Sequence, residues 1–335
     1  YKENMQRLSK SESVFLTAIA VILFLPTSLY AAQGEQSSIA WGTLILGMVG
    51  GLAFFLYGME KMSEGMKRSA GNRMRAILST LTQNRVVAMG VGAFVTMVIQ
   101  SSSATTVMLV SFVQAELMTF TQSLGVILGA DIGTTITAQM VAFKLTDYAL
   151  AMVAAGFSLR MFGKTDNLRS IGDIVLGFGI LFFGMKLMSD TMAPLRSYPD
   201  FINMMKSLEN PLMGILAGAV FTAVVQSSSA TTGVVIVLAQ QGLVSLEAGI
   251  PIILGANIGT CVTAGLASIG TQREAKRVAL AHVIFKIIGV LLILPLIQPF
   301  ADVIRYVGGQ FGSGTARQIA NAHTAFNIGI GLLFL

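Results

Sequence analysis

Apolar residues fill most of this chain in long continuous stretches, which short polar segments interrupt. Several stretches approach the roughly 20 residues that an α-helix needs to cross a bilayer. They lack the strict polar–apolar alternation of a transmembrane β-strand. The pattern therefore predicts an all-α polytopic membrane protein. Helices are expected at residues 14–30, 39–62, 86–99, 104–114, 122–143, 147–162, 171–192, 211–225, 230–240, 246–269, 276–300 and 317–335.

Two identical polar segments interrupt the apolar pattern. Gln-Ser-Ser-Ser-Ala-Thr-Thr occurs at residues 100–106 and again at residues 226–232, each time between two helices too short to span a membrane. Consecutive hydroxyl groups are costly at membrane depth unless they find partners. Close packing of small residues is the alternative reading, but two identical copies favour one site built from two halves.

The two motifs belong to a longer internal repeat. Gly58 and Gly184, residues 100 and 226, and Gly129 and Gly255 are all 126 positions apart. Two long apolar units of this kind are typical of transporter halves. We expect an N-terminal signal-like segment or first membrane helix at 1–38, transport repeats at 39–165 and 166–300, and a C-terminal membrane helix at 301–335.

Basic residues predict how the two halves are oriented. The loop at 67–85 has five Lys or Arg residues, whereas its counterpart at 193–211 has two, balanced by two acidic residues. After the glycine-threonine segments the bias reverses, with one lysine at 144–147 and three basic residues at 270–277. Because basic loops stay inside, this indicates two inverted-topology repeats with re-entrant helical hairpins and broken helices. Both termini would be cytoplasmic if the first helix is retained.

Composition narrows the class of protein. Of the 335 residues, 54% are hydrophobic and only 11% are charged, against about 25% charged in a soluble domain. The net charge of +6 lies in loops, where it orients the protein rather than binding nucleic acid. Cys261 is the only cysteine, so neither a disulfide framework nor a thiolate metal site can form within one chain. No nucleophile–base pair is visible, so we expect no enzyme and no cofactor.

The serine motifs have the chemistry of an anion site. Serines suit helix N-caps, and the apolar run that follows each motif suits a helix start. A buried helix N-terminus offers free N–H groups and a partial positive charge. Neither motif contains Lys or Arg, which predicts a reversible, neutral cage for a small tetrahedral oxyanion. The expected ligands of that oxyanion are Ser101, Ser102, Ser103, Ser227, Ser228 and Ser229.

The glycine-threonine segments have the chemistry of a cation site. Gly-Ala-Asp-Ile-Gly-Thr begins at Gly129 and Gly-Ala-Asn-Ile-Gly-Thr at Gly255. Glycines four apart permit an unwound backbone, whose carbonyls would join side-chain oxygens around sodium. A carboxylate at membrane depth is functional by default, although a structural carboxylate paired with a hydroxyl is the alternative. The expected sodium ligands are Gln100, Thr105, Asp131, Thr134, Thr135, Gln226, Thr231, Asn257 and Thr260. No other metal is expected.

A second, shorter duplication contains both histidines. Ala281-His282-Val-Ile-Phe285 and Ala322-His323-Thr-Ala-Phe326 are 41 positions apart. A proton relay is possible chemistry for them, but a packing or interfacial role is favoured.

The paired Gln-Ser-Ser-Ser motifs, each followed by Gly-Ala-(Asp/Asn)-Ile-Gly-Thr, resemble the type II sodium/phosphate cotransporters, in particular their bacterial branch, over roughly residues 40–335. The resemblance implies sodium-coupled import of inorganic phosphate by alternating access in a bacterial inner membrane. It implies that the serine motifs hold the phosphate. Many bacterial members add a cytoplasmic PhoU-like domain, which makes such a domain an expected partner beyond residue 335. The family often places asparagine after Ala-His-x-x-Phe, so Asn327 fits and Lys286 departs.

Two other functions stay open at this point. The same architecture could carry another small oxyanion or a carboxylate, because a hydroxyl cage does not exclude either. An anion channel or phosphate sensor would show downhill flux without sodium dependence. Sodium stoichiometry, sodium versus proton coupling and oligomeric state have no signal in the sequence.

Overall fold

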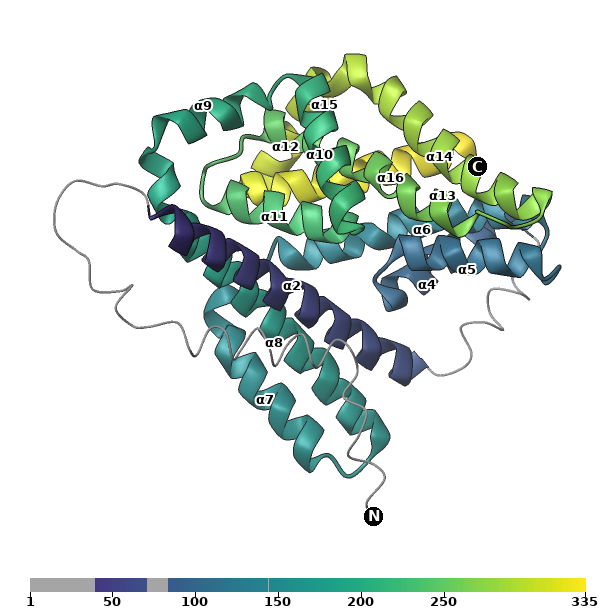
Figure 1. The fold of residues 1–335 in the computed structure, drawn as a ribbon, viewed down its shortest axis with the longest axis horizontal. Helices are drawn as coiled ribbons and strands as arrows, with labels where there is room; N and C mark the ends of the chain where they lie inside the picture. Colours follow the sequence, from purple (N-terminus) through teal and green to yellow (C-terminus); the bar gives the residue numbers. More distant parts are fainter. Residues whose placement is uncertain (1–39, 71–83, 144) are drawn as a thin grey trace.

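The computed structural model describes residues 40–70, 84–143 and 145–335 (Figure 1). Every regular element in these ranges is a helix, which confirms the all-α prediction. The predicted helix at 14–30 and most of the basic loop after residue 70 lie outside the described residues. The α-helices are α2 Trp41–Ala70, α4 Arg85–Ile99, α5 Ser102–Gln114, α6 Phe120–Val141, α7 Ala149–Phe162, α8 Asp166–Met192, α9 Pro199–Ser207, α10 Pro211–Val225, α11 Ser228–Gln240, α12 Leu246–Gly259, α13 Cys261–Ala267, α14 Arg273–Ile293, α15 Ile297–Gln310 and α16 Thr315–Phe334. Short 3-10 turns lie at η2 Thr146–Tyr148, η3 Ala193–Ser197 and η4 Leu294–Leu296.

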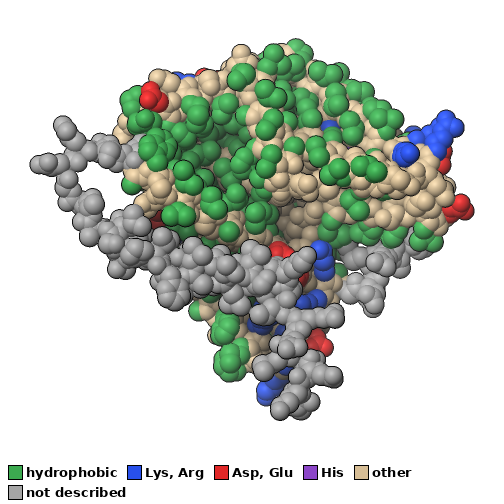
Figure 2. Space-filling model, in the orientation of Figure 1, with side chains coloured by type: hydrophobic (Ala, Val, Ile, Leu, Met, Phe, Trp, Pro, Cys, Tyr) green, Lys and Arg blue, Asp and Glu red, His purple; other side chains and the backbone are tan. Residues whose placement is uncertain are grey.

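The helices are those of a multi-pass membrane protein. In the described residues, five helical segments are long and apolar enough to cross a membrane, or six if the bent α9–α10 pair is one span. Large apolar side chains are widely exposed, and Figure 2 shows them spread over the body formed by the later helices. Such exposure suits contact with lipid rather than water. The five segments are Trp41–Ala70, Phe120–Val141, Asp166–Ser197, Leu246–Ala267 and Arg273–Gln310.

Helices α2, α7 and α8 form an elongated bundle that projects from the remaining helices (Figure 1). The bundle is tight because glycines bring its backbones together: a Cβ on Gly58 would lie 2.7 Å from the carbonyl of Gly177. Near one end, buried Asp173 of α8 pairs with Arg68 of α2 at 2.9 Å and Arg160 of α7 at 3.2 Å. Gly58 and Gly184, which are equivalent in the repeat, thus both serve the close packing of α2 against α8.

The glycine-threonine segments correct one expectation. Helix α6 runs without a break through Gly129 and Gly133, so the expected unwound backbone is absent there. Instead, a Cβ on Gly129 would collide with the carbonyl of Met89 in α4. Glycines four apart lie on one face of a helix, and here that face lets α6 approach α4 closely, as small residues do in membrane helices.

The second glycine-threonine segment behaves differently. A Cβ on Gly255 would likewise collide with the carbonyl of Ile215 in α10. Helix α12 nevertheless ends at Gly259 and α13 begins at Cys261, so the helix expected at 246–269 has a one-residue interruption at Thr260, which keeps helical backbone angles (φ −66°, ψ −17°). The interruption falls just after the glycines rather than between them.

One helix was missed by the sequence pattern. Residues 193–211 were expected to form a loop, yet they contain η3 and α9. Proline at the first helical position of α9 fits a helix start, because its missing N–H needs no partner there. Helix α9 meets α10 at a bend of 99°, which leads the chain into the second serine motif.

Candidate substrate and cation sites

Both serine motifs adopt the same backbone. Helices α4 and α10 each end at a glutamine with left-handed backbone angles: Gln100 has φ 60° and ψ 24°, and Gln226 has φ 57° and ψ 25°. The next residue caps the following helix, since Ser101 accepts from the N–H of Ala104 at 3.1 Å and Ser227 from that of Ala230 at 3.2 Å. The predicted role of serine as N-cap is confirmed in both motifs.

A hydroxyl pair ties each motif together. Thr96 and Thr105 lie 2.9 Å apart, oxygen to oxygen, and Thr222 and Thr231 lie 2.6 Å apart. All four side chains are buried. Thr105 and Thr231, which the sequence placed among the sodium ligands, therefore join the two helices of their motif.

The structure brings both motifs to one cavity of about 320 Å³. Because one water occupies roughly 30 Å³, this volume accommodates a small oxyanion with several waters. The first N–H groups of α5 and α11 have no partner within their own helices. Within the described residues, four motif hydroxyls that line the cavity make no hydrogen bond: those of Ser102, Ser103, Ser228 and Ser229. The cavity wall is thus rich in unused neutral donors.

One face of α2 completes the cavity, which sequence reasoning missed. Glu60 and Lys67 line it and are exposed, so they add one negative and one positive charge. Ser63, on the same face, donates to the carbonyl of Ile99 at 2.6 Å and so positions the end of α4. The sequence predicted Lys67 only as part of a basic loop and assigned no role to Glu60.

The two glutamines have different surroundings. Gln100 is 6% exposed, and its side-chain oxygen accepts from Thr137 of α6 at 2.6 Å. Its amide donates to the carbonyl of Met97. Gln226 is exposed and lines the cavity. Thr263, the counterpart of Thr137, has a buried hydroxyl without a hydrogen-bond partner among the described residues.

Asp131 and Asn257 lie around one ammonium group. The Nζ of Lys286, on α14, is 2.7 Å from a carboxylate oxygen of Asp131 and donates to the amide oxygen of Asn257 at 3.1 Å. All three side chains are less than 10% exposed. The Nε2 of His282 lies 3.8 Å from the same carboxylate oxygen. Asp131 therefore pairs with a cation of the chain itself, not with a hydroxyl.

The remaining predicted sodium ligands bond to their own helices. Thr134 donates to the carbonyl of Ala130 at 3.0 Å, and Thr135 to that of Ile132 at 2.7 Å. Thr260 donates to the carbonyl of Asn257 at 2.7 Å. Their hydroxyl oxygens keep an accepting lone pair, but these three threonines primarily satisfy backbone groups.

The histidines are core residues. His282 of α14 is 1% exposed and His323 of α16 is 2% exposed, so neither lies at an interface with water. Both ring nitrogens of His282 and the Nδ1 of His323 lack hydrogen-bond partners among the described residues. Among a proton relay, an interfacial role and packing, the buried positions of the histidines fit packing, near the Asp131–Lys286 pair.

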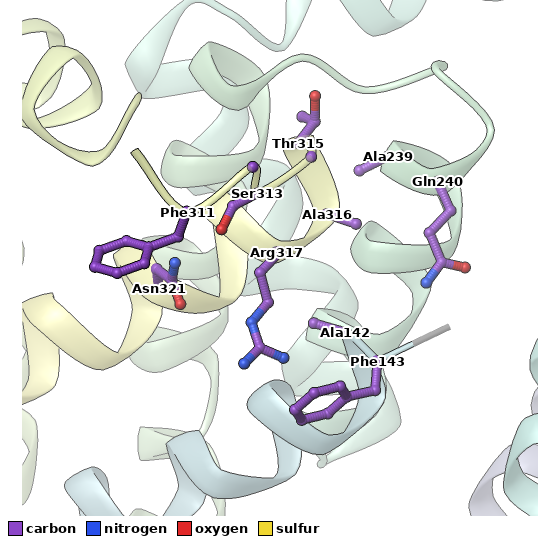
Figure 3. A pocket seen from close by; sticks show the side chains of 12 residues that line it. Ala142, Phe143, Ala239, Gln240, Phe311, Ser313, Thr315, Ala316, Arg317 and Asn321 are labelled. Atoms are coloured by element: carbon purple, nitrogen blue, oxygen red, sulfur yellow. The ribbon is translucent and has the colours of Figure 1, made fainter. Parts of the chain in front are cut away.

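A second cavity, of about 750 Å³, lies away from the motifs at the ends of α6 and α11 and the start of α16 (Figure 3). Arg317 points across it toward Phe143, with the guanidinium carbon 4.1 Å from the ring centroid. Arg317 also donates to the carbonyl of Gln139 at 3.3 Å. This cavity is larger but contains no serine-motif residue, so size alone does not identify the site.

A multi-pass helical protein that encloses a hydroxyl-lined cavity between two short helix pairs has the form of a transporter for a small polar solute. The chain belongs to the Na+/Pi-cotransporter family, whose model matches residues 54–190 and 200–335. This is a family of transporters, so the chain is not an enzyme.

Relatives agree with that assignment. The chain is 30% identical to the uncharacterized protein YqeW of Bacillus subtilis (strain 168) over 285 residues, which cover 85% of the chain and 91% of YqeW. It is 27% identical over 285 residues to YjbB of Escherichia coli (strain K12), a candidate inorganic phosphate export protein.

That alignment covers 85% of the chain and 52% of YjbB, so the chain spans about half the length of that relative. The human sodium-dependent phosphate transport protein 2B is 32% identical over 139 residues, which cover 38% of the chain and 20% of that protein. No solved structure matches the chain significantly.

Proposed function

We propose that this protein carries inorganic phosphate across a bacterial inner membrane by sodium-coupled alternating access, with phosphate held between the two serine motifs. The observation that carries the proposal is the shared cavity: the first residues of two helices line it, among them four serines whose hydroxyls make no hydrogen bond within the described residues. Oriented N–H and O–H donors suit a phosphate dianion. The family and the relatives named for phosphate support the substrate.

We place sodium beside the phosphate in this proposal. Glu60 and the exposed Gln226 supply carboxylate and amide oxygens to the cavity, and hard oxygen ligands suit sodium by analogy with other hard cations. A bound sodium ion would also reduce repulsion between Glu60 and an anion. Lys67 supplies a fixed positive charge on the same side of the cavity.

Import is the proposed direction. The basic bias around Arg68 and Arg85 and around Arg273–Arg277 supports a cytoplasmic location for those ends, two inverted halves and, if the first helix is retained, two cytoplasmic termini. An inward sodium gradient then drives phosphate inward. The second candidate is export, which the name of the YjbB relatives favours.

Uptake of labelled phosphate into proteoliposomes tests the site. Ser102→Ala and Ser228→Ala should each lower sodium-driven uptake about ten-fold or more, because each removes a hydrogen bond to a charged ligand worth about 1.5–3 kcal/mol. Ser111→Ala is the matched control: it lies on the same helix as Ser102, and its exposed hydroxyl donates to the carbonyl of Val107.

Other outcomes of the uptake experiment distinguish the alternative functions. Undiminished uptake by both variants would remove the serine motifs from the substrate site. Downhill flux that persists when choline replaces sodium would indicate a channel. Stronger inhibition by sulfate than by unlabelled phosphate would indicate another oxyanion. Uptake only into vesicles in which the cytoplasmic face of the protein points outward would favour export.

A further inference from the structure

We propose that the ammonium group of Lys286 takes the place of a coupling sodium ion between Asp131 and Asn257, so that this cation is tethered to the protein and is neither bound from solution nor transported. The inference rests on the proposed sodium-coupled transport, and it concerns how many sodium ions take part.

The position of Lys286 is the first argument. Asp131 and Asn257 are equivalent residues of the internal repeat, 126 positions apart, on α6 and α12. Lys286 comes from a third helix, α14, yet its Nζ contacts an oxygen of each. The residues that the repeat duplicates thus converge on a single positive charge, where two halves of a cation site would converge on an ion.

The chemistry of the two oxygens is the second argument. A carboxylate oxygen and an amide oxygen, both shielded from water, are hard ligands that suit either sodium or an ammonium group. A buried carboxylate without a positive partner is strongly unfavourable. Because Lys286 supplies that partner permanently, Asp131 does not need an ion from outside.

The second duplication supplies the third argument. Lys286 follows Ala281-His282-Val-Ile-Phe285, and Asn327 occupies the same place after Ala322-His323-Thr-Ala-Phe326. Asn327 is also buried, and its amide donates to the carbonyl of His323 at 2.8 Å. An asparagine therefore fits this pattern on a buried helix face, which makes Lys286→Asn a substitution that the chain itself suggests.

The site lies close enough to the substrate cavity to influence it. Asp131 is six residues before Thr137, about 9 Å along α6, and Thr137 holds Gln100 of the first serine motif. Replacing Lys286 by asparagine would remove a positive charge and the volume of a four-carbon stem. Asp131 would then be a buried carboxylate with space beside it for a monovalent cation.

Sodium-dependent thermal stability tests the proposal without requiring transport. For the purified full chain in detergent, the melting temperature is compared in sodium chloride and in choline chloride at equal concentration. Lys286→Asn should gain a sodium-specific rise of at least about 2 °C that the native protein lacks, together with an additional bound ²²Na+ at equilibrium. Lys276→Asn removes the same charge from an exposed position on the same helix and should behave as the native protein does.

Lack of any sodium-specific gain in a folded Lys286→Asn variant would overturn the proposal. If that variant does not fold, the double variant Asp131→Asn/Lys286→Asn removes both charges together. Its phosphate uptake should keep the sodium dependence of the native protein, and a loss of that dependence would show that Asp131 holds sodium after all. Failure of the proposed function is distinct, because the native protein would then take up no phosphate whereas the sodium-binding result would stand.

Discussion

The two serine motifs have one sequence and one backbone but two different settings. In the first, buried Gln100 accepts from Thr137, and α6 runs unbroken past the contact. In the second, Gln226 is exposed, and Thr263 in the short helix α13 has a buried hydroxyl without a hydrogen-bond partner among the described residues. Seven identical residues fix the local turn and cap. The helix packed against them decides whether the glutamine is held.

This difference gives the two motifs unequal contacts with their neighbouring helices. The Gln100–Thr137 hydrogen bond attaches the first motif to α6, the helix that also contains Asp131. Among the described residues no corresponding bond holds Gln226, whose exposed side chain lines the cavity. The same turn therefore occurs once with its glutamine bonded to the neighbouring helix and once with its glutamine exposed.

The largest expected effect tests the close glycine contact between helices that both halves contain. Gly129→Ala and Gly255→Ala should each destabilise the protein by about 3 kcal/mol or more, because the added Cβ would collide with a backbone carbonyl of the neighbouring helix. Thermal unfolding in detergent measures the effect. Gly90→Ala on α4 is the control, since a Cβ there meets no atom within 4 Å. A mild effect at only one of the two glycines would show that the helix pairs are not equivalent.

A smaller effect tests directly whether Gln100 and Gln226 differ in their hydrogen bonding. Thr137→Val should cost about 1–3 kcal/mol, because it leaves the buried oxygen of Gln100 without a donor. Thr263→Val should be neutral or stabilising, since it removes a buried hydroxyl that has no partner among the described residues. If thermal melts showed the same loss of stability for both variants, Thr263 would also have to donate a hydrogen bond to Gln226, as Thr137 does to Gln100.

The smallest effect concerns the left-handed glutamines. Gln226→Gly should raise stability by about 0.5 kcal/mol, because glycine adopts positive φ without steric cost and the exposed side chain gives up little. Gln100→Gly removes the contact with Thr137 and should lower stability by about 1 kcal/mol. The melting temperatures of these two variants should therefore shift in opposite directions. A shift in the same direction would contradict the difference between the two motifs.

Much of the fold could be predicted from apolar runs. The expected helix at 211–225 coincides with α10, and the serines were placed correctly at the start of α5 and α11. Helix α9 was missed because its polar, proline-led sequence resembles a loop. The unwinding of the glycine-threonine segments was wrong at Gly129 because two glycines four apart suit both a bend and a close helix contact, and only the neighbouring helix distinguishes them.

The candidate site was predictable only in part. The repeat identified both motifs, since a sequence pattern marks equivalent positions directly. Lys286 was visible only as a departure from a pattern, because nothing local shows that its long side chain reaches Asp131 and Asn257 from another helix. The contribution of Glu60 and Lys67 from α2 was missed for the same reason.

The glycine contacts set a mechanical limit on any movement of this protein. Carbonyls of α4 and α10 lie so close to the glycines of α6 and α12 that neither pair can slide or separate without losing that contact. Each pair must then rotate or translate as one rigid body that includes its serine turn. The hinges have to lie outside the pairs, and the 99° bend between α9 and α10 is a place where the described backbone changes direction sharply.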